Sequence, residues 1–213
     1  MKKNFFITFE GGEGTGKSTQ ARLLSDFLKE NGHSCVLTRE PGGSEGAEEI
    51  RNLVVKGDVA RWDVMTEALL MFAARRDHLV KTVWPAMKEG KTVICDRFAD
   101  STMAYQGFGY ADRGLGQATV ERLYQTVVGD FKPDLTIILD MPVEAGVARA
   151  VKRDATVNRY EKMGLDFHRN LRNAFLEIEK KEPARCVVID ANRTIEEIAA
   201  DIKSVVQTRL LKV

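Results

Sequence analysis

Short apolar runs alternate with longer amphipathic segments along most of the chain. Five runs rich in β-branched and aromatic residues lie at residues 5–9, 35–38, 92–95, 135–139 and 186–189. Runs that are this short and this apolar are typical of strands buried on both faces. Helical patterns separate them, so the order predicts an α/β fold with a five-stranded parallel sheet flanked by helices on both faces.

Three segments between and after these runs have clear helical signals. Residues 17–29 have helical apolar spacing and stop at Asn31-Gly32, a typical C-cap. The final helix opens at Thr194 with Glu197 three residues later, a capping box, and is expected to run to about Leu211. Residues 63–88 predict another helix, with these apolar residues sharing one face: Met65, Leu69, Phe72 and Ala73.

Length and charge narrow the class of protein. The 213 residues are enough for one sizeable core, so we expect a single domain, 1–213. With 32 Lys+Arg against 31 Asp+Glu, the overall charge gives no reason to expect nucleic acid or a membrane as partner. No apolar run approaches the length of a membrane span, which favours a cytoplasmic protein. The three cysteines and three histidines show no metal-ligand spacing; core packing is expected for the cysteines, and surface or packing roles for the histidines.

A glycine-rich loop follows the first predicted strand and leads directly into the first predicted helix. It comprises Gly11, Gly12, Glu13, Gly14, Thr15, Gly16, Lys17 and Ser18. Glycines let backbone N–H groups converge on phosphate oxygens, and the helix N-terminus adds positive partial charge. Lys17 is expected to reach the β- and γ-phosphates of a nucleoside triphosphate, and Ser18 to bind Mg²⁺. The loop therefore predicts a phosphotransferase.

Other segments are expected to join this loop at the carboxyl edge of the sheet. Asp96 follows the third strand and fits a carboxylate that supports the metal, although a turn or capping role is the alternative. Arg97 comes next and would face the transferred phosphoryl group. Residues 40–46 form a second glycine-rich loop after the second strand.

A basic segment at about residues 149–161 does not fit a minimal layout of strands and helices. It contains Arg149, Lys152, Arg153 and Arg159. Such segments are often solvated surface, and that interpretation stays open. The alternative is a mobile lid that closes over the phosphate site.

Several longer motifs resemble one family over nearly the whole chain. GTPase motifs for guanine recognition are absent, and chain length favours small-molecule kinases. The chain resembles the bacterial thymidylate kinases in the segments TREPGG at 38–43, LLMFAARR at 69–76, DRF at 96–98, STMAYQG at 101–107 and KPDLT at 132–136. The resemblance implies the fold of P-loop nucleoside monophosphate kinases.

The resemblance also implies an acceptor site for dTMP. Phe72 would stack on the thymine ring, and Arg76, one helical turn later, would hydrogen-bond the base. Gln106 would contact the Watson–Crick edge, and Tyr105 would disfavour a 2′-hydroxyl. The full implied set of dTMP-binding residues is Glu13, Arg39, Phe72, Arg76, Arg97, Ser101, Tyr105 and Gln106. Arg39 and Arg97 would hold the acceptor phosphate.

The donor site and the lid follow from the same resemblance. The implied ATP-binding residues are Gly11, Gly12, Glu13, Gly14, Thr15, Gly16, Lys17, Ser18, Thr19 and Arg149, the last covering the adenine ring. Because the loop lacks an arginine, the lid would supply the missing charge. Arg153 is our choice for that arginine, with Lys152 and Arg159 as competitors, since Asn158-Arg159 and Asp154 depart from the usual lid pattern.

The expected reaction is ATP plus dTMP giving ADP plus dTDP. Lys17, Arg97 and Arg153 would be catalytic, with Mg²⁺ held by Ser18 and Asp96, and a homodimer is implied by the resemblance alone. Two alternatives stay open at this point. A deoxynucleoside kinase would need a carboxylate base beside the sugar, and a nucleotide-binding switch would transfer nothing.

Overall fold

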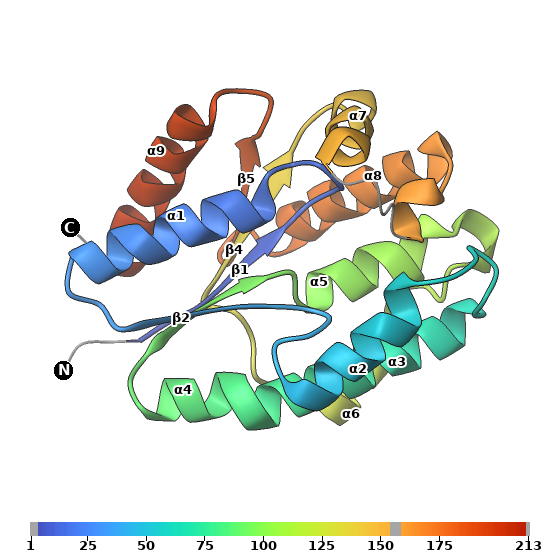
Figure 1. Cartoon of the computed structure of the whole chain (residues 1–213), viewed down its shortest axis with the longest axis horizontal. Helices are drawn as coiled ribbons and strands as arrows, with labels where there is room; N and C mark the ends of the chain where they lie inside the picture. Colours follow the sequence, from blue (N-terminus) through green and yellow to red (C-terminus); the bar gives the residue numbers. More distant parts are fainter. Residues whose placement is uncertain (1–3, 154–158, 212–213) are drawn as a thin grey trace.

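The computed structural model describes residues 4–153 and 159–211 of the chain. Its centre is one sheet of five parallel strands in the order β2-β3-β1-β4-β5 (Figure 1). The strands are β1 Phe6–Glu10, β2 Cys35–Arg39, β3 Thr92–Asp96, β4 Leu135–Asp140 and β5 Cys186–Asp190. The predicted α/β architecture is confirmed. Each strand ends one residue later than its apolar run, and each added residue is charged, so charged side chains gather at the carboxyl edge.

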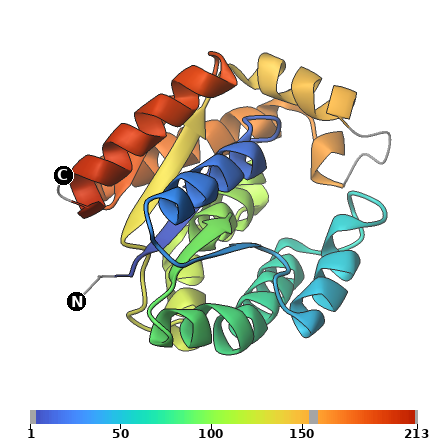
Figure 2. The same ribbon diagram turned by 60° about the vertical axis from the view of Figure 1, so that its left-hand side comes forward.

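Helices cover both faces of the sheet because its strands alternate between two apolar cores. Ile7 and Phe9 belong to one core with Leu24 and Ile202, whereas Phe6 faces the other. On the first face lie α1 (Lys17–Glu30) and α9 (Ile195–Val206), which pack against each other. On the second lie α3 (Val64–His78), α4 (Trp84–Lys88), α6 (Gln117–Val127) and α8 (Leu165–Lys181) (Figures 1 and 2).

The predicted helix over residues 63–88 is three consecutive elements. Asp63 caps α3 by accepting hydrogen bonds from the backbone N–H groups of Met65 and Thr66. A π-helical turn at Leu79–Val83 then connects α3 to α4, whose first turn contains Pro85. The Trp84 N–H, just before Pro85, donates to the Leu79 carbonyl five residues back, as a π-helical turn requires.

The four apolar residues predicted to share one face of this helix are not all buried. Met65 and Leu69 are 38% and 50% exposed, and Ala73 is also exposed, whereas Phe72 is 1% exposed and lies in the core. Periodicity predicts which residues share a face of a helix. It does not predict which face packs against the rest of the protein. The outward-facing apolar side chains on α3 remain to be explained.

The remaining elements frame the carboxyl edge. They are α2 (Glu45–Val55), α5 (Ala99–Thr102), the π-helical segment η2 (Met103–Gly109), 3₁₀ turns at Ala111–Arg113 and Tyr160–Lys162, and α7 (Val143–Arg153). The first part of the predicted lid, Arg149 to Arg153, is therefore helical. The predicted capping box at Thr194 is confirmed, and a π-helical turn, Gln207–Leu211, follows α9. Among the described helices, none is long and apolar enough to cross a membrane.

Candidate active site

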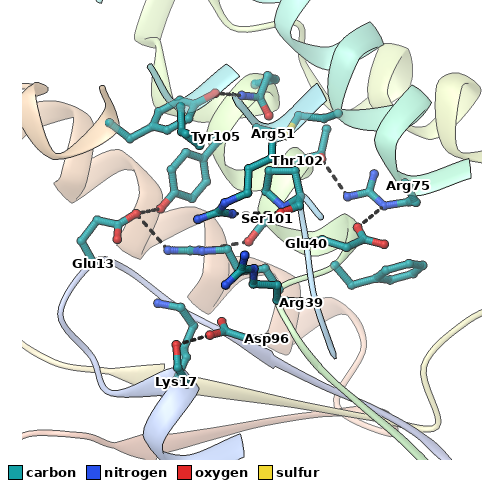
Figure 3. A pocket seen from close by; sticks show the side chains of 18 of the residues that line it. Glu13, Lys17, Arg39, Glu40, Arg51, Arg75, Asp96, Ser101, Thr102 and Tyr105 are labelled. Carbon is teal, nitrogen blue, oxygen red and sulfur yellow. Dashed lines mark hydrogen bonds and ion pairs between the residues drawn. The ribbon is translucent and has the colours of Figure 1, made fainter. Parts of the chain in front are cut away.

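A cavity of about 450 Å³ opens at the carboxyl edge of the sheet, where ligands bind in open α/β folds (Figure 3). It brings together residues that lie far apart in the sequence. The predicted site residues that line it are Glu13, Gly14, Gly16, Lys17, Ser18, Thr19, Arg39, Asp96, Arg97, Ser101, Tyr105 and Gln106. Gly11, Gly12 and Thr15 instead form part of a smaller hollow behind the loop.

The glycines of the loop are required by its backbone. Gly11 has φ +127°, and a Cβ there would lie 2.3 Å from the carbonyl oxygen of Leu139. Gly14 has φ +70°, and a Cβ there would lie 2.0 Å from the carbonyl oxygen of Gly146. Side chains at these positions would clash with rigid backbone, so the loop can follow this path only with glycine.

Lys17 is folded back onto its own loop. Its Nζ donates to the carbonyl oxygens of Gly11 and Gly12, at 3.1 and 2.5 Å, and lies 3.3 Å from the Thr15 hydroxyl. Burial, together with the nearby charge of Arg97, lowers the pKa of the Lys17 ammonium to about 8. An anion in the loop would oppose both effects, so the ammonium is poised to receive one.

Ser18 and Asp96 meet at the first turn of α1 and the end of β3. The Ser18 hydroxyl donates a short hydrogen bond to the Asp96 carboxylate. A hydroxyl and a carboxylate are oxygen ligands of the kind that Mg²⁺ prefers. Among the described residues no group of three or more His, Cys, Asp and Glu could hold a metal by itself, so a cation here would also need oxygen atoms from a ligand or water.

Arg97 has a left-handed backbone, with φ +72°, which is uncommon for a residue with a side chain. This conformation turns its guanidinium toward the loop, where Nη1 donates to the Gly11 carbonyl at 3.0 Å and Nη2 to Glu13 at 2.9 Å. The Tyr105 hydroxyl donates to the same Glu13 oxygen at 2.7 Å (Figure 3). Burial opposes ionisation of Glu13, but Arg97, Lys17 and Tyr105 outweigh it and lower its pKa to about 2.

Glu10 does not line the cavity, but it positions two residues that do. It is fully buried at the end of β1 and accepts hydrogen bonds from the Phe98 backbone N–H at 2.7 Å and from the Ser101 hydroxyl at 2.5 Å. Burial, followed by the negative charge of Asp100, raises the pKa of Glu10 to about 8. The carboxyl group fixes the start of α5 and with it the direction of Ser101.

The structure corrects the expected positions of Phe72 and Arg76. The Phe72 ring is packed in the core beneath the sheet and does not line the cavity. The Arg76 guanidinium lies 5.0 Å over the Trp84 ring and donates to the carbonyl of Val127 in α6. Core packing of Phe72 sets the rotation of α3, and that rotation turns both residues away from the cavity.

Met71 and Arg75, one position earlier, line the cavity instead. Met71 and Arg75 have the same i, i+4 spacing as the predicted pair. Because two arginines are adjacent in the sequence, the spacing alone is compatible with either pair facing the cavity. Arg75 is buried, its Nε donates to Glu40 at 2.8 Å, and its Nη2 donates to Thr102 at 3.1 Å (Figure 3). Its third nitrogen, Nη1, has no hydrogen-bond partner among the described residues.

Glu40 holds Arg75 in this orientation. It is buried after β2 and also contacts His78 Nδ1 at 2.9 Å, while His78 Nε2 lies 2.8 Å from the Thr38 hydroxyl. No local motif in the sequence marks this relay, because its members come from two segments about 35 residues apart. The expected packing role of His78 thus includes orienting a side chain of the site.

Gln106, like Arg75, has one side-chain polar atom without a hydrogen-bond partner among the described residues. It is fully buried, and its Nε2 donates to Glu67 at 3.1 Å and to the Tyr160 hydroxyl at 3.3 Å. Its Oε1 has no hydrogen-bond partner in the described part of the chain. Two residues of the cavity wall, Arg75 and Gln106, thus each carry one buried polar atom that lacks a partner among the described residues, a donor on Arg75 and an acceptor on Gln106.

Three guanidinium groups face the cavity near the loop: Arg97, Arg39 and Arg51. Arg39 lies 3.2 Å from the Glu48 carboxylate, but both side chains are exposed. Arg51 was not predicted; it donates to the Pro41 carbonyl at 2.9 Å. Burial, followed by the charge of Arg39, lowers the pKa of Arg51, which indicates positive charge that an anion could neutralise.

The basic residues predicted for the lid differ in where the structure places them. Arg149 is exposed on α7 and donates to the Ala191 carbonyl after β5, at 3.2 Å. The side chain of Arg153 lies outside the described residues, as do residues 154–158. Arg159 is fully buried and ion-paired with Glu67, which removes it as a group that faces the cavity.

Comparisons with known proteins find relatives that match nearly the whole chain. Residues 9–202 match the family model of thymidylate kinase. The chain is similar to a thymidylate kinase of Caulobacter vibrioides, with 52% identity over 211 residues and 99% of each chain covered. It is similar to one of Ruegeria pomeroyi, with 49% identity over 205 residues, covering 96% of this chain and 95% of the relative. A crystal structure of thymidylate kinase from Ehrlichia chaffeensis superposes with a TM-score of 0.76 and 36% identity, covering 96% of this chain and 99% of that one.

Proposed function

The chain belongs to the thymidylate kinase family, and from that premise we propose which of its residues bind the substrates and transfer the phosphoryl group. The family assignment supports ATP-dependent phosphorylation of dTMP to dTDP. The two alternatives, a deoxynucleoside kinase and a non-catalytic switch, are therefore not needed to explain the motifs of the chain. The individual roles below are proposals that rest on the geometry of the cavity.

The observation that carries base recognition is the unpartnered donor and acceptor in the cavity wall. The edge of thymine presents an N3–H donor beside an O4 acceptor. The free Oε1 of Gln106 can accept from N3–H, and the free Nη1 of Arg75 can donate to O4. Buried polar groups without partners are costly, so a ligand that satisfies both gains affinity over one that satisfies neither. Met71 supplies an apolar surface for the flat ring.

The acceptor phosphate would bind among Arg97, Arg39 and Arg51. A phosphate monoester has a second pKa near ~6, so it is largely dianionic at neutral pH and needs no side chain to remove a proton. Guanidinium groups offer forked donors that suit such a dianion. Tyr105 and Glu13 lie beside Arg97 and would face the sugar, with Tyr105 leaving little space for a 2′-hydroxyl.

The donor nucleotide would bind in the glycine-rich loop. Lys17 would exchange its loop carbonyls for the β- and γ-phosphates, and Arg149 would cover the adenine ring. Ser18 and Asp96 fit Mg²⁺ as oxygen donors, directly or through water. When bound, the metal would neutralise charge on the transferred group.

Catalysis would consist of alignment and charge neutralisation. Lys17 and Arg97 both donate to the Gly11 carbonyl, so both would lie beside the transferred phosphoryl group and could stabilise the negative charge that is redistributed during transfer. A lid arginine, for which Arg153 remains our proposal, would complete the set and help to exclude water.

The cytoplasmic location and the single-domain organisation remain predictions from the sequence.

The exposed apolar face of α3 supports the proposed homodimer. Met65, Leu69 and Ala73 recur at four-residue spacing on this face, and the aliphatic side chain of Val80 is 46% exposed in the following π-helical turn. Exposed apolar side chains that gather on one element are typical of protein interfaces. A second copy of the chain could cover these side chains through its own α3, in an isologous contact.

The acceptor preference tests the function directly. In an ADP-release assay over thymidine and the common nucleoside monophosphates, we expect dTMP to give the highest kcat/KM. Thymidine should be inactive, because it lacks the phosphate that the three arginines bind. Faster ADP release with thymidine, or none with any monophosphate, would contradict the assignment.

The corrected register on α3 predicts unequal effects of two neighbouring substitutions. Arg75→Lys keeps the charge beside Glu40 but loses the forked donors, so kcat/KM for dTMP should fall roughly 10- to 100-fold, the equivalent of one charged hydrogen bond. Arg76→Lys is the matched control and should change kcat/KM less than about twofold. Steady-state kinetics with both variants decide between the registers; the reverse order would restore the original prediction.

Arg153→Ala tests the lid. Turnover should fall by roughly 10²–10³-fold, as when one donor to developing charge is removed, while the dissociation constant of dTMP stays within about twofold. Lys152→Ala, on the same helix, serves as the comparison. If only the lysine variant loses turnover, the role belongs to Lys152.

Leu69→Glu tests the dimer. A buried carboxylate at the centre of the α3 contact should convert the dimer into a monomer in sedimentation-velocity experiments. Ile195→Glu is the control, because this exposed apolar residue lies at the start of α9, remote from α3. A wild-type monomer, or a Leu69→Glu dimer, would contradict the proposal.

A further inference from the structure

Glu67 lies behind the cavity wall without lining the cavity itself. It is fully buried on α3 and accepts hydrogen bonds from four residues of two other segments. One carboxylate oxygen accepts from Arg159, and the other accepts from Gln106 at 3.1 Å and Tyr160 at 3.2 Å. The Tyr110 hydroxyl lies 2.9 Å from both oxygens. Of its partners, Gln106 and Tyr160 line the cavity, whereas Arg159 and Tyr110 do not.

The contact with Gln106 decides which end of its amide faces the cavity. An amide can present either its oxygen or its NH₂ group, and the two orientations occupy nearly the same space. A carboxylate paired with Arg159 is only an acceptor, so the NH₂ group of Gln106 must point toward Glu67. A flipped amide would place two acceptors against each other. The free Oε1 is therefore the amide atom turned away from Glu67, on a residue that lines the cavity.

From this arrangement we propose that Glu67 is a positioning residue that selects thymine over cytosine. The inference rests on the proposed dTMP kinase function and deepens it. With Oε1 in the cavity, Gln106 can accept from the N3–H of thymine or uracil. Cytosine has an acceptor at N3 and an amino group in place of O4, so it would meet the Gln106 oxygen at one atom and the Arg75 donor at the next.

Removing the charge of Glu67 should release this constraint. A glutamine at position 67 could either donate to or accept from Gln106, so the amide of Gln106 could turn its NH₂ group into the cavity and donate to N3 of cytosine. Arg75 would still oppose the amino group of cytosine, because Glu40 and Thr102 fix its orientation independently. Selectivity should therefore weaken rather than invert.

The test measures kcat/KM of Glu67→Gln with dTMP, dUMP and dCMP. The dTMP-to-dCMP ratio should fall about tenfold, the equivalent of roughly one hydrogen bond. The dTMP-to-dUMP ratio should stay within about twofold, because uracil presents the same N3–H and O4 edge. A general distortion of the cavity would be expected to change both ratios. The loss with dTMP should appear mainly in KM.

Tyr110→Phe is the matched control. It removes a hydrogen bond to both oxygens of Glu67 but leaves the carboxylate and the Gln106 contact intact, so neither ratio should change. Gln106→Leu removes the amide altogether and should lower the dTMP-to-dCMP ratio at least as far as Glu67→Gln does. Thermal unfolding of each variant checks that the fold is retained.

Glu67→Gln leaves Arg159 buried without a counter-charge, which can cost several kcal/mol and prevent folding. In that case Glu67→Gln combined with Arg159→Met removes both charges and should show the same change in selectivity. A folded variant, single or double, with an unchanged dTMP-to-dCMP ratio would overturn the inference. Absence of dTMP phosphorylation by the wild-type protein would instead overturn the proposed function, so the two failures are distinguishable.

Discussion

Carboxylates taken out of water at the edge of the sheet are the constraint on which the site depends. A buried carboxylate is costly unless it accepts hydrogen bonds or pairs with a cation. The structure satisfies this requirement with side chains that also face the cavity. The pairs are Glu13 with Arg97, Glu40 with Arg75, and Glu67 with Gln106. Glu10, whose pKa burial raises to about 8, holds Ser101 largely as the neutral acid at neutral pH. Each glutamate thereby fixes the direction of one group that is proposed to contact a substrate.

This arrangement explains how a flexible residue such as arginine can read a base. The guanidinium of Arg75 has five N–H donors, and a solvated side chain would sample many orientations. Glu40 and Thr102 hold two of its nitrogens, which leaves the third directed to the cavity. The cost of ordering the side chain is met on folding, so a ligand does not bear it on binding. The same reasoning applies to Gln106 and Glu67.

The phosphate side of the cavity follows a different principle. There Arg39, Arg51 and Arg97 line the cavity together, and Glu13 pairs with Arg97 and Glu48 with Arg39. Burial and the charges of neighbouring arginines lower the pKa values of Arg51 and Lys17. Excess positive charge suits a region that must bind two sets of phosphates and bring them into contact. On the base side Arg75 and Gln106 are held by carboxylates. On the phosphate side Arg51 and Lys17 have no carboxylate hydrogen-bonded to them among the described residues, so substrates are left to neutralise them.

The sequence by itself determined the fold, the phosphate-binding loop and the family. These depend on local patterns: apolar runs of strand length, glycines where the backbone turns left-handed, and motifs in a fixed order. It also predicted Lys17, Arg97, Tyr105 and Gln106 at the cavity. The tertiary structure decided the rotation of α3. A helix turns about 100° per residue, so a register one residue off exchanges the cavity face for another, and only the packing of Phe72 in the core fixed it. The glutamates behind the wall were likewise decided by packing, because their partners come from segments distant in sequence.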